Sequence, residues 1–171
     1  MAYIYEYIKY FYKDNLNNQP IFYDLGSGTG KSLFAISLMQ KFKKIIGIEY
    51  LENLYKLSLE NKNYYSKIIN EKIKDKNIFS FDIQNDIEII HGDFLKQNWE
   101  NANIIFANSP CFSNDLINYI ASKANKECKS NTIIITVTKN LNKLNSDWEL
   151  RDGFRRLMSW ESATIYIYKR K

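Results

Sequence analysis

Short apolar runs alternate with stretches of helical periodicity along most of the chain. Five runs predict buried strands, because apolar and β-branched residues dominate them: 21–25, 44–48, 87–90, 103–107 and 132–137. Helical spacing marks 32–42, 51–73 and 115–126. The buried side of the middle helix is expected to hold Leu54, Leu57, Tyr64, Tyr65, Ile68 and Ile69. Near the end, 154–160 and 163–168 predict two more strands joined by a short turn, which makes them antiparallel.

Strand–helix alternation of this kind predicts an α/β fold: a doubly wound, mostly parallel sheet of seven strands with an antiparallel C-terminal hairpin. In such folds a ligand binds outside the carboxyl ends of the strands, where the strand order reverses. The loops after the first four strands are therefore the expected place of function. Residues 1–19 predict an amphipathic N-terminal helix or extension, and residues 20–171 predict one globular domain.

Composition narrows the class of protein. The 171 residues suffice for one domain with a proper core. Cys111 and Cys128 cannot form a disulfide framework, which predicts a reducing, intracellular compartment, either nucleus or cytoplasm. The single histidine, His91, argues against a zinc site, so no metal is expected. No stretch reaches the roughly 18 apolar residues of a membrane span. The net charge of +5 permits an acidic partner or nucleic acid without requiring one.

The loop after the first strand reads Asp-Leu-Gly-Ser-Gly-Thr-Gly-Lys-Ser, residues 24–32. Alternate glycines let the backbone come close to a ligand. A phosphate-binding P-loop needs glycine at position 25, where leucine stands, and a dinucleotide loop needs glycine at position 31, where lysine stands. The spacing resembles instead the first motif of class I S-adenosylmethionine-dependent methyltransferases. From this loop alone, a dinucleotide enzyme, a P-loop protein and a structural turn stay open as alternatives.

The charge of this loop supports the methyltransferase interpretation. The methionyl part of S-adenosylmethionine carries an ammonium and a sulfonium, so the acid Asp24 would help to bind it. The same acid would repel a pyrophosphate. The resemblance implies that the loop holds the cofactor through Asp24, Gly26, Ser27, Gly28, Thr29 and Gly30.

Acidic residues after the next two strands extend the predicted cofactor site. Glu49 follows the glycines by about 20 residues, and its carboxylate is suited to accept from both ribose hydroxyls. After the third strand, Asp93 is placed to accept from the adenine amine and Phe94 to stack on the adenine ring. His91 is interpreted as a strand-end histidine and not as a catalytic group.

The fourth strand is followed by Asn-Ser-Pro-Cys-Phe, residues 108–112, at the position of the catalytic motif in enzymes that methylate an amine. The side-chain carbonyl of Asn108, with neighbouring backbone carbonyls, can accept from a target NH₂ and aim its lone pair at the methyl group. Asn108 is expected to contact the cofactor as well, and Phe112 to wall the substrate channel. A plain Asn-Ser-Pro turn is the alternative.

Taken in chain order, five segments resemble the disruptor-of-telomeric-silencing (DOT-type) family of histone lysine methyltransferases. They are DLGSGTG, GIE, GDFL followed by Trp99, IFANSPCF, and the late Ser159-Trp160. The family also carries a Tyr-Gly-Glu motif and further capping helices before the glycine loop, and residues 1–19 do not contain that motif. A smaller relative with another substrate, or a cap supplied from elsewhere, would account for the difference.

The fourth motif of that family reads roughly I-F-V-N-N-F-x-F, so Asn108 and Phe112 match it. Ser109 and Pro110 depart from it, toward the Asn-Pro-Pro-Tyr/Phe motif of methyltransferases that act on adenine or glutamine amines. The family has tyrosines after the late Ser-Trp that line the lysine channel. Tyr166 is the nearest match, with a one-residue gap.

The resemblance implies a Rossmann-like methyltransferase catalytic domain over 20–171 that moves a methyl group from S-adenosylmethionine to an amine nitrogen, leaving S-adenosylhomocysteine. We predict a protein lysine as the acceptor, in a histone, a nucleosome or another protein. The predicted catalytic residues are Asn108, Phe112 and Tyr166. A nucleic-acid base methyltransferase acting on an RNA or DNA amine is the alternative, and a catalytically silent cofactor-binding subunit is the second alternative.

Overall fold

The structure is a computed structural model that describes residues 6, 9–10, 19–73, 85–158 and 161–171. Most of the predicted N-terminal extension lies outside these residues, as does the late Ser159-Trp160. The chain forms two compact units, unit 1 (Met1–Gly92) and unit 2 (Asp93–Lys171). None of the helices within the described residues is long and apolar enough to span a membrane.

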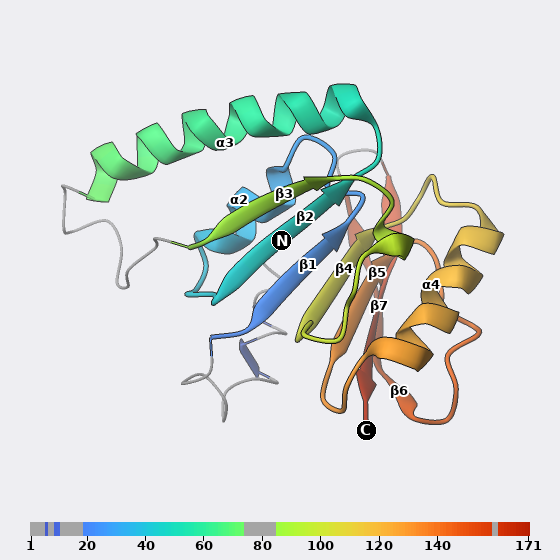
Figure 1. Ribbon diagram of the computed structural model, residues 1–171. Helices are drawn as coiled ribbons and strands as arrows, with labels where there is room; N and C mark the ends of the chain where they lie inside the picture. The colour runs from blue at the N-terminus through green and yellow to red at the C-terminus, as the bar shows by residue number, and fades with distance from the viewer. Residues whose placement is uncertain (1–5, 7–8, 11–18, 74–84, 159–160) are drawn as a thin grey trace. The chain divides into compact units, whose positions relative to one another are not determined.

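Unit 1 is built on three parallel strands in the order β3-β2-β1 (Figure 1): β1 (Ile21–Leu25), β2 (Lys44–Glu49) and β3 (Ile87–His91). All five β2 residues after Lys44 are buried, as expected for a strand with neighbours on both sides and helices against its face. The register sets Asp24 beside Gly47 and Glu49 beside His91. The three strands therefore end together, with Asp24 and Glu49 among the last residues of β1 and β2.

Two helices, α2 (Lys31–Ser37) and α3 (Glu52–Ile73), cover one face of these strands. The rings of Phe34 and Tyr65 stack between the helices, with centroids 5.0 Å apart. The predicted helix 32–42 was too long, because α2 ends at Ser37. Its end is set by a distant residue: the side chain of Asn85 donates to the Ser37 carbonyl at 2.8 Å and accepts from the Phe42 N–H at 2.6 Å.

The buried side of α3 differs from the predicted one. Leu57, Tyr64 and Ile68 are 42%, 68% and 37% exposed, so the prediction was wrong for these three. The core-facing position is taken instead by Ser58, which is fully buried. A small residue is needed there because α3 packs on the glycine loop: the Ser58 Cβ lies 3.7 Å from the place where a Cβ on Gly30 would stand.

Unit 2 contains two parallel strands and an antiparallel hairpin in the order β4-β5-β7-β6. These are β4 (Ile104–Asn108), β5 (Ile133–Val137), β6 (Trp148–Leu157) and β7 (Ser162–Arg170). The hairpin confirms the predicted antiparallel pair, although β6 begins six residues before the predicted start at 154. The early part of β6 is rich in charged residues, so the sequence shows no apolar alternation there that would predict a strand. This segment is a strand because it pairs with β7, across a register shift between Leu150 and Asp152.

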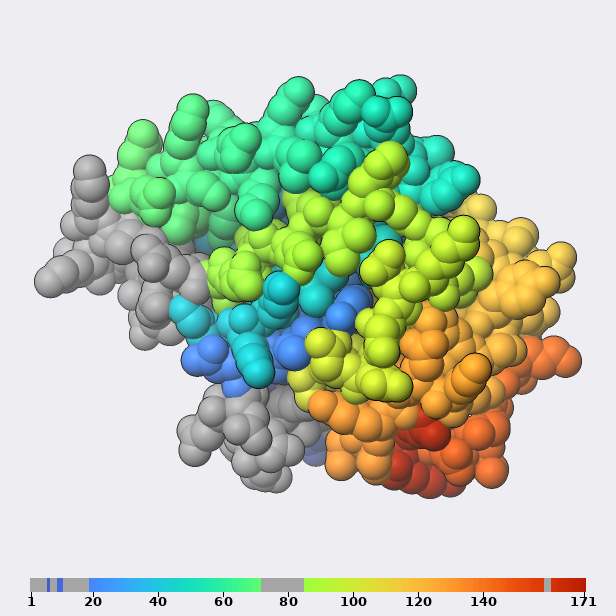
Figure 2. Space-filling model, in the orientation of Figure 1, coloured from blue at the N-terminus to red at the C-terminus, as the bar shows by residue number. Residues whose placement is uncertain are grey.

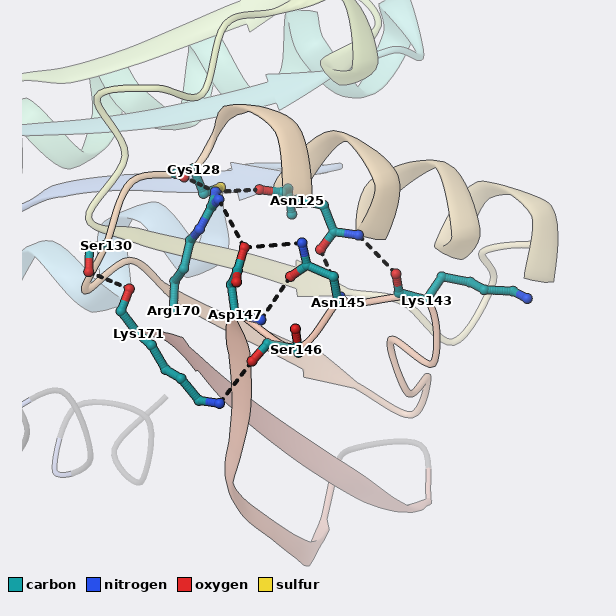
Figure 3. A network of polar contacts seen from close by, with 10 residues as sticks. Asn125, Cys128, Ser130, Lys143, Asn145, Ser146, Asp147, Arg170 and Lys171 are labelled. Atoms are coloured by element: carbon teal, nitrogen blue, oxygen red, sulfur yellow. Dashed lines mark hydrogen bonds and ion pairs between the residues drawn. The ribbon is translucent and has the colours of Figure 1, made fainter.

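The 3₁₀ helix η2 (Phe94–Lys96) and the helix α4 (Asn114–Glu127) complete unit 2. Ser113 caps α4, because its hydroxyl accepts from the Leu116 N–H at 3.1 Å. Figure 3 shows contacts at the other end of α4, where Arg170 donates to the carbonyls of Ala124 and Cys128. The Ala124 carbonyl also accepts from the Cys128 N–H, so Arg170 adds a second donor to it. Asp147 lies 3.7 Å from the same guanidinium, so strand β7, helix α4 and the loop before β6 are joined at one point.

Candidate active site

The glycine loop of unit 1 has the conformation that its sequence predicts. Gly26, Gly28 and Gly30 have φ angles of 77°, 56° and 82°, which other residues rarely adopt. A Cβ added to Gly28 would have no heavy atom within 4 Å, so the backbone at the middle of the loop borders open space. The loop is anchored to the neighbouring strand, because the N–H groups of Gly26 and Ser27 both donate to the Ile48 carbonyl, at 2.9 and 3.1 Å. A ligand can therefore approach a backbone that is already held in place.

Asp24 is a buried acid with one unsatisfied oxygen. Its side chain is 1% exposed, the Ser32 hydroxyl donates to Oδ2, and Oδ1 has no hydrogen-bond partner among the described residues. Burial raises the pKa of Asp24 from its ordinary value of 3.8 to about 7; the Ser32 hydrogen bond lowers this pKa and the charge of Glu49 raises it. A buried carboxylate oxygen without a partner is costly. A cationic group at Oδ1 would relieve that cost.

Glu49 binds the backbone of the glycine loop and still has lone pairs free for a ligand. It is 6% exposed, its Oε2 accepts from the Gly28 N–H at 2.8 Å, and its Oε1 accepts from the Leu51 N–H at 2.9 Å. Each carboxylate oxygen has a second lone pair, so two hydroxyl donors can still be accepted. Sequence analysis assigned Glu49 to the ligand alone and missed that it orders the glycine loop, because a contact across 21 positions leaves no local pattern.

Helix α3 adds a residue that sequence analysis also missed. The Asn61 amide donates to the Thr29 carbonyl at 3.1 Å, and this hydrogen bond links the glycine loop to α3. The only signal in the sequence is a polar residue one turn after Ser58 on the inner side of the helix.

The single histidine lies at the end of β3. The His91 ring stacks on Tyr55 with centroids 4.9 Å apart, and its Nε2 is 3.2 Å from the Tyr50 carbonyl. These contacts link β3 to the start of α3, which suits the structural role predicted for His91.

In unit 2, Asp93 and Phe94 occupy two different kinds of position. Asp93 caps η2, because its Oδ1 accepts from the Leu95 N–H at 2.8 Å. Phe94 is 8% exposed, and its ring lies 5.8 Å from that of Phe112 at an interplanar angle of 27° and 6.4 Å from that of Trp99. The structure thus brings together Phe94 and Phe112, for which the sequence predicted separate roles.

Asn108 is exposed at the end of β4, and the next residue holds it there. Ser109 is fully buried; its hydroxyl and its N–H both donate to the Val137 carbonyl, at 2.7 and 3.3 Å. The Phe112 N–H then donates to the Ser109 carbonyl at 3.3 Å. In the sequence, Ser109 is notable only because it departs from the family motif. In the structure, its hydrogen bonds hold the loop that carries Asn108 and Phe112.

Tyr166 lies on β7 opposite Thr136 of β5 and Gly153 of β6. In the same register Asn108 pairs with Val137, which pairs with Ile165. Paired residues share a face of a sheet and successive residues alternate, so the Tyr166 and Asn108 side chains leave the sheet on opposite faces. The strand register therefore does not bring these two predicted catalytic residues together.

Comparison with known proteins gives the family. The model of the family "Histone methylation protein DOT1" matches residues 4–160. The chain is also 30% identical, over 173 aligned positions, to a Caenorhabditis elegans histone-lysine N-methyltransferase, H3 lysine-79 specific. That alignment covers 90% of this chain and 17% of the relative, so the chain spans about a sixth of that protein's length.

Solved structures support the fold. An RNA methyltransferase from Salinibacter ruber in complex with S-adenosyl-L-homocysteine matches with a TM-score of 0.68 at 13% identity, covering 99% of this chain and 92% of that one. The Bacillus subtilis m1A22 tRNA methyltransferase TrmK matches with a TM-score of 0.66 at 14% identity, covering 99% and 64%. A putative methylase from Haemophilus influenzae gives a TM-score of 0.64 at 16% identity, covering 98% and 88%.

The predicted fold class is confirmed: an α/β protein with a mostly parallel seven-stranded sheet, an antiparallel C-terminal hairpin and the fold of methyltransferases. The chain belongs to the DOT1 family of histone methylation proteins, as the resemblance of its motifs indicated. The match includes the glycine loop, Glu49, Asp93, Asn108 and Phe112. Tyr166 lies beyond it.

Proposed function

We propose that this chain is an S-adenosylmethionine-dependent N-methyltransferase domain whose acceptor is the amine of a protein lysine. The observation that carries the proposal is the DOT1 family match over residues 4–160, which includes both the glycine loop and Asn108. The chain spans a small part of its C. elegans relative, so activity, substrate and partner are all parts of the proposal.

The buried acids of unit 1 fit the cofactor. Asp24 Oδ1, buried and without a partner among the described residues, suits the methionyl ammonium, and the open backbone at Gly28 leaves room for the chain that carries it. The remaining lone pairs of Glu49 suit the two ribose hydroxyls. In unit 2, the second oxygen of Asp93 suits the adenine amine and the Phe94 ring the adenine face. When bound, S-adenosylmethionine supplies an electrophilic methyl group on a sulfonium.

The acceptor must reach this methyl group as a neutral amine. Lysine has an ordinary pKa of about 10.4, so the neutral form at pH 7 lies roughly 4–5 kcal/mol uphill. An amine that donates to the Asn108 side-chain carbonyl would have its lone pair aimed, and desolvation would lower its pKa. The Ser109–Val137 hydrogen bonds fix the backbone next to Asn108, so the position of this residue is set before the acceptor arrives. The lysine ammonium loses one proton to water before transfer; the neutral amine then forms the N–CH₃ bond as the S–CH₃ bond breaks, which leaves a methylammonium and S-adenosylhomocysteine, so no basic side chain is required.

A histone is the acceptor we favour. The C. elegans relative is a histone-lysine methyltransferase specific for H3 lysine-79. The net charge of +5 suits approach to an acidic particle such as a nucleosome. A histone substrate would place the protein in the nucleus.

An RNA or DNA amine is the second candidate. The order Asn108, Pro110, Phe112 favours it, since an aromatic side chain two residues after a proline can stack on a flipped base. The RNA methyltransferases among the solved structures share the fold with this chain, at 13% and 14% identity, and do not decide the substrate.

One experiment separates these functions. The full chain is incubated with S-adenosylmethionine labelled in its methyl group and with separate pools of nucleosomes, free histones, other proteins and RNA. Label in a histone lysine supports the proposal, and label in RNA replaces it by the second candidate. Calorimetric titration with S-adenosylmethionine and S-adenosylhomocysteine completes the test: binding without transfer to any pool indicates a cofactor-binding subunit, and failure of both to bind refutes all three.

A further inference from the structure

Helix α3 carries an apolar stripe that the core of unit 1 does not use. We define the α3 stripe as Leu57, Tyr64 and Ile68, which are 42%, 68% and 37% exposed. At 100° per residue, these three side chains lie within about 40° of one another on the helix. Figure 2 shows α3 running along the surface of unit 1 with many of its side chains uncovered. The helix is 22 residues long, which is enough for a helix–helix interface of several turns.

The spacing within the stripe is that of a helix–helix seam. Asn61 lies at the stripe's edge, and with it the residues follow one another at intervals of four, three and four, the alternation found at the a and d positions of coiled coils. Core contacts lie on a different side of α3, where Ser58 and Ile69 are buried. The seam spacing therefore belongs to a surface beside the core and not to the core itself.

Two charges of opposite sign flank the stripe on its solvent side. Glu60 and Lys67 stand seven residues apart, so they occupy the same position in successive repeats. When a helix of this kind pairs with an antiparallel copy of itself, Leu57 faces Ile68 of the second copy and Asn61 faces Tyr64 of the second copy. Glu60 then meets Lys67 of the second copy, and by symmetry the pair forms twice. A parallel pairing would set Glu60 opposite Tyr65 and would leave the charges unmatched.

We propose that α3 is a self-association surface, through which two copies of this chain pair antiparallel along the α3 stripe. A second copy is the occupant because one helix carries both members of the charge pair at positions that only a twofold, antiparallel partner satisfies together. The inference is independent of the proposed methyltransferase function, since neither the α3 stripe nor its two flanking charges belong to the cofactor or acceptor site; Asn61, at the edge of the stripe, is the one seam residue that also contacts the glycine loop.

The test is sedimentation equilibrium of the full chain over a wide concentration range. Wild type dimerises, and Glu60→Lys or Lys67→Glu alone weakens the dimer about tenfold, since two attractive pairs become repulsive. Mixing the two single variants restores association as a one-to-one heterodimer, because each supplies the charge that the other lacks. The double variant, with both charges exchanged, recovers self-association.

Two further variants complete the design. Asn63→Lys adds the same charge outside the stripe and leaves the dimer unchanged, whereas Tyr64→Lys makes the chain monomeric with an unchanged circular dichroism spectrum. A wild-type chain that stays monomeric at millimolar concentration overturns the proposal. So do single charge variants that associate as tightly as wild type, or mixed variants that fail to pair.

Discussion

The two units handle their polar groups in opposite ways. In unit 1 the acids predicted for the cofactor are buried: Asp24 is 1% and Glu49 6% exposed, and burial raises the pKa of Asp24 to about 7. In unit 2 the predicted acceptor residue, Asn108, is exposed, neutral and held by its neighbour Ser109. The buried charge of Asp24 in unit 1 thus has an electrostatic cost that a cationic ligand can relieve. Asn108 in unit 2 is uncharged and carries no such cost; there the structure fixes only the position of a hydrogen-bonding group. Changes to Asp24 should therefore alter cofactor binding and its pH dependence, and changes to Asn108 should alter methyl transfer alone.

The largest effect should follow from Asn108→Ala. Removing a hydrogen-bond group that acts on the reacting atoms commonly lowers a rate by about 10²–10³-fold. Single-turnover transfer to the accepted substrate should fall by that amount, while the calorimetric affinity for S-adenosylhomocysteine changes by less than about threefold. Asn114→Ala, an exposed asparagine at the start of α4, is the matched control and should transfer normally. If cofactor binding is lost together with transfer, Asn108 does not have the acceptor role proposed for it.

Asp24→Asn should have the second-largest effect, and that effect should be on cofactor affinity. The substitution removes the charge that pairs with an ammonium, an interaction worth about 1.5–3 kcal/mol, so cofactor affinity should fall roughly 10- to 100-fold. The free energy of unfolding at pH 8 should rise, because the variant no longer buries a carboxylate. Calorimetry and urea titration measure the two quantities. Asp86→Asn, at an exposed acid of the same unit, should change neither.

The pH dependence follows from the raised pKa of Asp24, about 7 in the folded protein. As pH falls through 7 the carboxylate takes up a proton, so cofactor affinity should drop about tenfold per pH unit below 7. Stability has the opposite sign: the cost of burying the charged acid is absent below pH 3.8, grows between pH 3.8 and 7, and is complete above 7. Both slopes should vanish in Asp24→Asn, and an equal slope in that variant would assign the titration to another group.

Ser109→Ala should have a moderate effect confined to unit 2. The buried hydroxyl bond to the Val137 carbonyl is lost, although the Ser109 N–H still donates there. We expect about 1 kcal/mol of lost stability and a several-fold slower transfer, with cofactor affinity unchanged. Ser122→Ala, on the exposed face of α4, provides the control. An unchanged transfer rate would mean that the loop keeps Asn108 in place without this bond.

Tyr166→Phe should have the smallest effect. Its side chain and that of Asn108 leave the sheet on opposite faces, so we expect transfer within about twofold of wild type. Tyr168→Phe is the contrasting variant, because that hydroxyl donates to Asn140 and accepts from Leu141, and its loss should cost stability. A tenfold loss of transfer in Tyr166→Phe would restore the catalytic role that sequence analysis predicted.

Local signals accounted for most of the fold. Apolar runs located the first five strands within a residue at each end, since buried strands of a mostly parallel sheet demand nearly continuous apolar residues. The predicted bounds and buried faces of elements were wrong where contacts with residues distant in the sequence determine them. Asn85 ends α2, pairing with β7 makes a strand of the charged start of β6, and contact with the glycine loop turns α3 so that Ser58 faces the core.

The sequence by itself determined the cofactor chemistry and the family, because glycine spacing, an acid near the end of each of three strands and an Asn-Ser-Pro-Cys-Phe loop are carried by residue type and order. Tertiary structure decided how those residues are held. It gave Asp24 its raised pKa, joined Glu49 to the backbone of Gly28, and made Ser109 the anchor of Asn108. It also turned the α3 stripe outward. Burial and hydrogen bonds between residues far apart in the chain depend on packing, and no local pattern of residues encodes them.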